Sequence, residues 1–139
     1  MKKKRIGIIL TIMLLLIAGI LVFKYMQRTT YTLKLPKVED VKSIVLNNEN
    51  RREVITDVEE IEDIIYVLDG NGRASEKEST NDSPVNIEQL IKLEFNFKDG
   101  GTSIAYSYAN DGGYYFEQPY NGIYQISGDD YNSIEKYSK

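Results

Sequence analysis

The stretch IKLEFNFKDGGTSIAYSYANDGGYYFEQPYNGIYQIS, Ile91 to Ser127, decides the fold. Apolar and polar residues alternate from Ile91 to Phe97, which is typical of an antiparallel strand with one face on the core. Asp-Gly-Gly occurs twice, and these residue types tolerate the positive φ angles of hairpin turns. The pattern therefore predicts a four-stranded β-meander with turns at Lys98–Gly101, Asn110–Gly113 and Tyr120–Gly122.

Shorter elements precede the meander. Tyr31 to Leu35 alternates and ends at a proline, which predicts a short strand. Residues 42–48 are rich in β-branched side chains, residues 48–50 suit a turn, and residues 51–56 have the pattern of a returning strand. We therefore expect a hairpin here. Residues 72–86 are small, charged and aperiodic, which predicts a loop.

An amphipathic helix is expected between the hairpin and this loop. Thr56-Asp-Val-Glu59 fits a capping box, which predicts that the helix begins at Thr56. Its apolar stripe has helical spacing and consists of Ile61, Ile64, Ile65 and Leu68. Gly70 is the expected end, and Asp129 or Asp130 is expected to cap a short last helix. The predicted fold class is therefore α+β: a small antiparallel sheet, one amphipathic helix packed on it and a short C-terminal helix.

The N-terminal segment differs from the rest of the chain. Residues 6–23 carry no charge and follow the basic cluster Lys2–Arg5. As a helix they would span about 27 Å, close to the hydrocarbon thickness of a bilayer. Their length and the lack of a small-x-small motif favour an uncleaved signal-anchor over a cleaved secretory signal, which stays open as an alternative.

This segment divides the chain into two parts. Residues 1–28 are the basic N-terminus and transmembrane anchor, and residues 29–139 are the extracytoplasmic domain. The basic cluster predicts a cytoplasmic N-terminus in a single-pass protein of the cell membrane. If the segment is cleaved instead, the domain is secreted.

The charge of the domain restricts its partners. Residues 29–139 hold all twenty-one acids and eleven of the seventeen bases, a net charge of −10. Nucleic acid is therefore excluded as a partner. A basic protein, a cation or a neutral ligand stays possible.

The residue types present argue against catalysis. The chain has no histidine and no cysteine, which removes the commonest general base and every thiol mechanism. Asp69–Glu76 resembles the start of a calcium loop but has Arg73 and Ala74 where an oxygen ligand and a glycine belong. We expect no enzyme, no cofactor and no metal. Glu94 and Glu117 lie on neighbouring expected strands, but paired acids are inevitable among twenty-one.

Clustered tyrosines raise the question of a binding surface. Eight of the eleven tyrosines fall between Tyr106 and Tyr137. Aromatic rings on both faces of one strand can stabilise the sheet by cross-strand pairing, or form an exposed platform for a peptide or glycan. The candidate contact residues are Tyr115, Glu117, Tyr120, Asn121 and Tyr124, with Asn81 and Asp82 second. These last two lie in a loop that could equally be a purely structural turn.

Two runs, Phe95–Tyr108 and Tyr114–Tyr124, carry a resemblance. They are similar to a family of small uncharacterised exported domains of Gram-positive, Firmicutes-type bacteria, whose members have a basic start, one apolar segment and an "EQPYxGIY" strand pair before a short helix. Ser79–Pro84 is similar to a polar loop of that family. The resemblance covers most of residues 33–137 and implies location and fold type, with no activity to transfer.

The expected function is a membrane-anchored, non-catalytic binding or sensing module that contacts an envelope protein or a cell-wall component. Two alternatives stay open. A small carboxylate-dependent hydrolase of wall polymer needs two acids in one pocket. A structural subunit of a membrane complex would expose an apolar patch.

Overall fold

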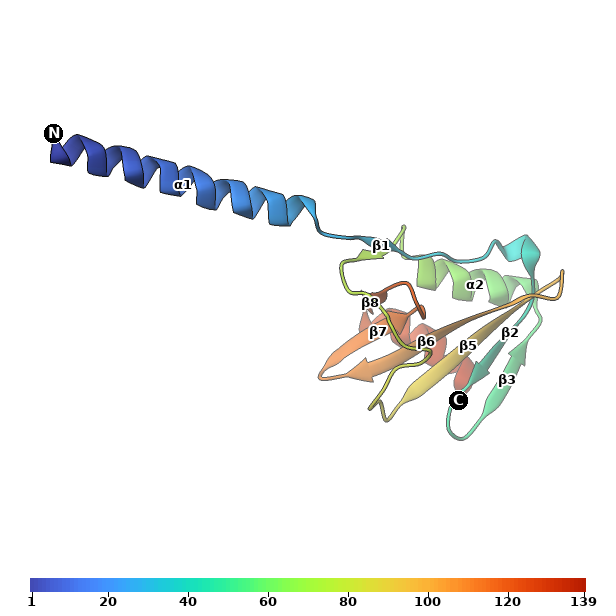
Figure 1. The fold of residues 1–139 in the computed structure, drawn as a ribbon. Helices are drawn as coiled ribbons and strands as arrows, with labels where there is room; N and C mark the ends of the chain where they lie inside the picture. Colours follow the sequence, from blue (N-terminus) through green and yellow to red (C-terminus); the bar gives the residue numbers. More distant parts are fainter.

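The computed structural model describes residues 1–139 and has a long helix that leads into one domain (Figure 1). Helix α1, Lys2–Met26, has 25 residues and buries none of them against the domain. It is long and apolar enough to cross a membrane, a property that signal sequences share. Only residues 27–30 separate it from the first strand.

A six-stranded antiparallel sheet forms the centre of the domain, in the order β3-β2-β5-β6-β7-β8. Its strands are β2 Val41–Asn47, β3 Arg52–Ile55, β5 Leu90–Phe97, β6 Thr102–Asn110, β7 Gly113–Glu117 and β8 Ile123–Ile126. The predicted meander is thus β5 to β8, and the predicted hairpin joins it by pairing β2 with β5.

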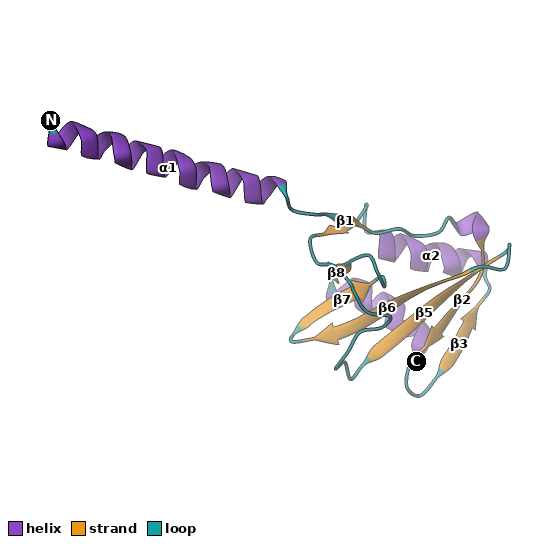
Figure 2. Cartoon of the chain, viewed as in Figure 1, coloured by secondary structure: helices purple, strands orange, loops and turns teal.

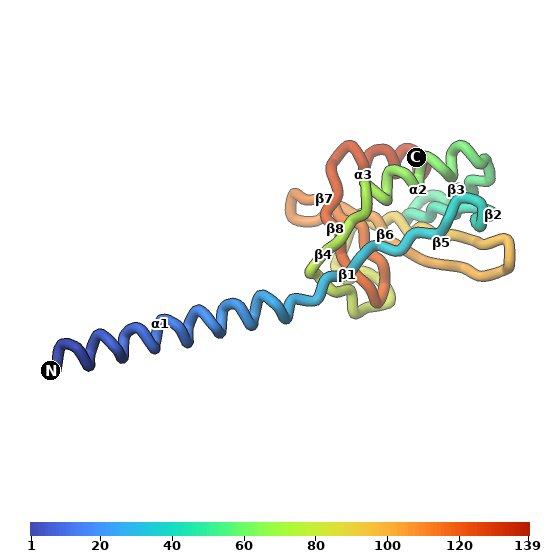
Figure 3. The backbone as a smooth tube through the Cα atoms, turned by 90° about the horizontal axis from the view of Figure 1, so that it is seen from above, coloured from blue at the N-terminus to red at the C-terminus, as the bar shows by residue number.

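Both helices of the domain cover the same face of the sheet, as the secondary-structure colouring and the view from above show (Figures 2 and 3). They are α2, Val58–Asp69, and α3, Gly128–Glu135. The predicted stripe of α2 is buried together with alternate residues of the strands, among them Leu93, Phe95 and Phe116. The α+β prediction is therefore confirmed.

The helix boundaries correct two predictions. Asp57, not Thr56, caps α2: its carboxylate accepts backbone N–H bonds from Glu59 at 3.0 Å and Glu60 at 3.2 Å. An ionised carboxylate at this place is also favoured by the helix dipole. Ser127, rather than Asp129 or Asp130, caps α3 through a capping box. Gly70 does end α2, with a φ angle of 49°.

Arg73 explains why the calcium-like loop has the wrong residue for calcium. Its Nε atom donates to the Leu68 carbonyl at 2.8 Å, and its Nη2 atom donates to the Val67 carbonyl at 3.1 Å and to Asp130 at 2.8 Å. The guanidinium therefore satisfies free carbonyls at the end of α2 and ties it to the start of α3. A Cβ at Gly70 would lie 2.5 Å from this group, so glycine is needed there for space as well as for φ.

A small second sheet links the tether to the domain. Strand β1, Tyr31–Thr32, pairs with β4, Ala74–Ser75. The strand predicted for Tyr31–Leu35 is thus shorter than expected, although the Leu33 N–H still donates to the Arg73 carbonyl at 2.9 Å and the Leu33 side chain is buried in the core. Residues 72–86 form the predicted loop apart from β4 and a single bridge between Glu78 and Gly122. Two short 3-10 helices, Val38–Asp40 and Lys136–Ser138, complete the domain.

Candidate functional site

The face of the sheet opposite the helices is crossed by residues 76–89, which we call the strap (Figure 1). The strap begins directly after β4. Its backbone pairs with the start of β8, since Ile123 donates to the Lys77 carbonyl at 2.9 Å and Ser79 donates to the Asn121 carbonyl at 3.2 Å. The strap therefore begins as a short extension of the sheet edge before it crosses the open face.

A buried carboxylate holds the strap on the sheet. Glu117 is 3% exposed and Ser79 is 2% exposed. The Ser79 hydroxyl donates to Glu117 Oε1 at 2.6 Å, and the Tyr108 hydroxyl donates to Glu117 Oε2 at 2.9 Å. Both carboxylate oxygens are thus satisfied within the fold, as a buried ionisable group requires. We call these three side chains the latch.

The third member of the latch, Tyr108, is also buried, and its hydroxyl is bonded to Glu117. Its burial, together with the bond to Glu117, raises the pKa of the Tyr108 phenol. The phenol is therefore protonated at neutral pH and acts as a donor to the carboxylate.

Tyr115 stands beside the latch in an ordered stack. Its ring stacks on Tyr108 with centroids 5.7 Å apart, and the Lys77 ammonium lies 5.7 Å from its centroid on the strap side. Aromatic stacking and a cation above the ring both restrict the side chain. Tyr115 is nonetheless partly accessible, so it offers a rigid ring surface in contact with solvent.

A groove of about 270 Å³ lies between the strap and β6–β7. Tyr115 and the latch residues Tyr108 and Glu117 line its sheet side. The strap contributes Lys77, Asn81, Pro84, Val85 and Ile87, and the remaining lining residues are Asn110, Asp111 and Ile123. We call this the strap groove. It combines an aromatic ring, amides, apolar side chains and one ammonium group, a mixture typical of ligand sites.

A second, shallower hollow of about 650 Å³ is lined by Asp82 of the strap, the first half of β6 and the loop after β7. Asp82, Tyr120 and Asn121 line it. The Tyr120 hydroxyl donates a short hydrogen bond to Asp82, which raises the pKa of Tyr120. The Asn121 amide donates to the Thr32 carbonyl at 2.9 Å, so this residue fastens the tether strand to the domain.

The seven predicted contact residues therefore separate into three groups. Tyr115, Glu117 and Asn81 line the strap groove, although Glu117 is buried. Tyr120, Asn121 and Asp82 line the second hollow. Tyr124 does not belong to any surface: it is 1% exposed and packs in the core. The prediction that Tyr124 belongs to the contact surface is thus wrong, because Tyr124 pairs with Phe116 on the helix-covered face.

Three residues of this site were not predicted from the sequence: Lys77, Ser79 and Tyr108. The position of Tyr108 could have been predicted, because a tight turn at Asp111–Gly112 sets Tyr108 opposite Tyr115. The contacts of Ser79 and Lys77 could not be predicted from the sequence, because they depend on how the strap crosses the sheet.

The acids around the strap groove are either already bonded or lie apart. No group of three or more Asp, Glu, His or Cys side chains could hold a metal ion. Glu117 has both oxygens occupied, and the nearest other acid lining the groove is Asp111 in an exposed turn. Neither the pairing nor the environment of these acids resembles a general acid–base pair.

Fold and site together define a class: a small α+β domain that follows one membrane-compatible helix and carries an aromatic, polar groove. The chain belongs to the DUF5301 family, described as "Domain of unknown function (DUF5300)", whose model matches residues 29–125. Searches of curated proteins and of solved structures found no match. The resemblance to an uncharacterised domain is thereby confirmed, whereas its Gram-positive origin and strand-pair motif stay predictions.

Proposed function

We propose that the chain is a membrane-anchored, non-catalytic binding module, in which the strap groove contacts an envelope protein or a cell-wall component outside the membrane. The observation that carries the proposal is Tyr115, which is partly accessible to solvent yet held between Tyr108 and Lys77. A ring that is already immobile loses little entropy when a ligand packs on it. Peptides and glycans both use such aromatic surfaces.

The tether favours a partner close to the membrane. Four residues connect α1 to β1, and β1 pairs with the strand that runs into the strap. Four extended residues span at most about 14 Å. If α1 is the anchor, the strap groove stays near the bilayer surface and meets other membrane proteins or the adjacent polymer.

Exposed apolar side chains of the domain argue against the structural-subunit alternative. The exposed large apolar side chains of the domain are Val54 on β3, Val58 and Tyr66 on α2, Val85 on the strap, Ile104 on β6 and Tyr120 in the loop after β7. They are divided among five parts of the domain, whereas a permanent subunit contact requires one large contiguous apolar patch. The hydrolase alternative is less supported because Glu117 is engaged in the latch.

Site-specific photocrosslinking in intact cells tests the proposal. Asn81 is exposed at the strap groove and its side chain makes no hydrogen bond in the protein, so a benzoylphenylalanine there leaves the latch intact. The matched control replaces Tyr66, 75% exposed on α2. We expect a discrete crosslinked product from position 81 alone, and its loss when Tyr115→Ala is added. Equal labelling from both positions, or none from position 81, contradicts the proposal.

A further inference from the structure

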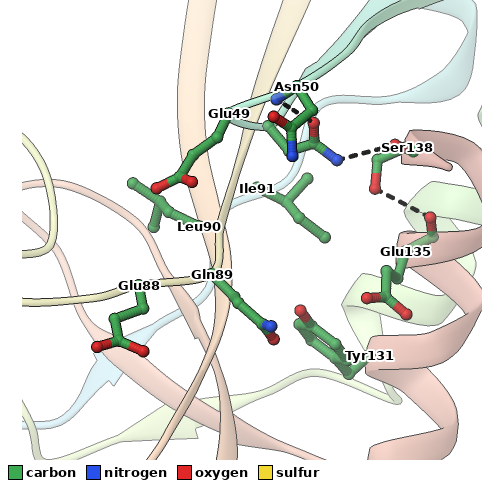
Figure 4. A pocket seen from close by; sticks show the side chains of 10 residues that line it. Glu49, Asn50, Glu88, Gln89, Leu90, Ile91, Tyr131, Glu135 and Ser138 are labelled. Carbon is green, nitrogen blue, oxygen red and sulfur yellow. Dashed lines mark hydrogen bonds between the residues drawn. The ribbon is translucent and has the colours of Figure 1, made fainter.

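A third pocket lies beside α3 and shares no lining residue with the strap groove. Its volume is about 170 Å³, and it is bounded by the β2–β3 turn, the end of the strap, the start of β5 and α3 (Figure 4). At about 30 Å³ per water molecule, this space equals about six waters, which suits one side chain better than a larger ligand.

Three carboxylates line this acidic pocket: Glu49 in the turn, Glu88 on the strap and Glu135 on α3. No basic residue lines it. Glu49 and Glu88 make no ion pair within the chain, whereas Glu135 pairs with Lys139 at 2.9 Å. Lys139 is 70% exposed, so a lysine ammonium is accommodated by one of the three carboxylates from the solvent side.

Tyr131 gives an independent indication of a ligand. It is 4% exposed, and its hydroxyl has no hydrogen-bond partner within the protein. Its ring is fixed against Tyr114, with centroids 4.9 Å apart. Figure 4 shows the hydroxyl directed into the pocket between Gln89 and Glu135. The residue is almost fully buried, but the hydroxyl itself stays accessible from the pocket, where it can accept a hydrogen bond from a donor outside the protein.

We propose that the acidic pocket binds the charged end of a lysine or arginine side chain of a protein partner. The carboxylates supply the opposing charge, and the Tyr131 oxygen accepts an N–H bond from the ammonium or guanidinium group. A metal ion is the less suitable occupant, because no acid cluster here has metal-ligating geometry. The net charge of −10 on residues 29–139 steers basic partners toward the domain.

The test uses the full chain in detergent micelles, titrated with N-acetyl-arginine amide and N-acetyl-lysine amide and followed by amide NMR. N-acetyl-norleucine amide is the neutral control. We expect saturable shifts around residues 48–50, 88–91 and 131–138 with either cationic probe. Shifts of equal size with the norleucine probe, or shifts spread over the whole acidic surface, overturn the proposal.

Two matched pairs of variants locate the binding. Tyr131→Phe should weaken probe affinity about tenfold without loss of fold, because the hydroxyl it removes has no internal partner. Tyr124→Phe, which removes a buried, unpartnered hydroxyl away from the pocket, should leave affinity unchanged. Glu88→Gln should weaken it about fivefold, and Glu62→Gln on the exposed face of α2 should not. Equal affinity of Tyr131→Phe and the parent chain refutes the site.

Discussion

Removal of the strap's hydrogen bond to Glu117 is the sharpest test of how this domain is held together. Ser79→Ala deletes one hydroxyl and little volume. The hydroxyl lies 2.6 Å from Glu117 Oε1, and both residues are almost fully buried. After the substitution, one carboxylate oxygen has no donor in a site with little access to water.

The size of the effect follows from this geometry. A hydrogen bond to a charged group contributes about 1.5–3 kcal/mol, and an unsatisfied buried acceptor adds to the cost of losing it. We therefore expect Ser79→Ala to lower the free energy of unfolding by about 2 kcal/mol. In a domain of this size that lowers Tm by roughly 10 °C.

The assay combines thermal unfolding with hydrogen exchange. Ser83→Ala is the matched control, because Ser83 lies on the same strap and its side chain has no hydrogen bond. Amides from residue 77 to residue 89 should exchange faster in Ser79→Ala than in Ser83→Ala. The amides of α2 should keep the same ranking of exchange rates in both variants. A Tm within 1 °C of the parent, with unchanged exchange along the strap, would refute the latch.

Three further predictions concern titration and packing. Burial, reinforced by the bond to Glu117, raises the pKa of Tyr108 above 10.0, so the unfolded chain loses this proton at a lower pH than the folded chain does. The free energy of unfolding should therefore fall as pH rises above about 10. Tyr108→Phe should reduce this dependence of stability on pH, measured by urea unfolding over a pH series. Burial disfavours ionisation of Asp130, but hydrogen bonds from Arg73 and Ser127 outweigh this effect and lower the pKa of Asp130. The free energy of unfolding should therefore fall as pH drops below about 4. Asp130→Asn should reduce this loss of stability at low pH. Tyr124→Phe removes a buried hydroxyl without a partner, so Tm should stay level or rise, and a fall of several degrees would show a missed bond.

Much of the scaffold could be predicted because local patterns decide it. Alternation in β5 and helical spacing in α2 each mark which side chains face the core, and the burial of Ile91, Leu93 and Ile64 follows from that alone. The cap of α2 was misplaced by one residue, because Thr56 and Asp57 are both good caps and the backbone decides between them.

The site was harder to predict because strand parity depends on loop length. Five residues, 118–122, separate Glu117 from its partner Ile123. This spacing sends Tyr124 to the face of Phe116 and Ile123 to the face of Glu117. A loop shorter or longer by one residue would reverse the two faces. Tyrosine suits either side, so its residue type does not show which side it faces.

The latch also gives the buried acidic side chain of this small domain a structural role. An apolar residue at position 117 would cost less to bury, but it would accept no bond from Ser79 or Tyr108. With glutamate, the strap is held in the one arrangement that brings two hydroxyls to one carboxylate. That arrangement places Lys77, two residues before Ser79, over Tyr115 and opens the strap groove beside it. We infer that the buried charge contributes specificity of strap placement more than stability. The inference predicts that Glu117→Leu retains the helices and sheet but no longer protects the strap from hydrogen exchange.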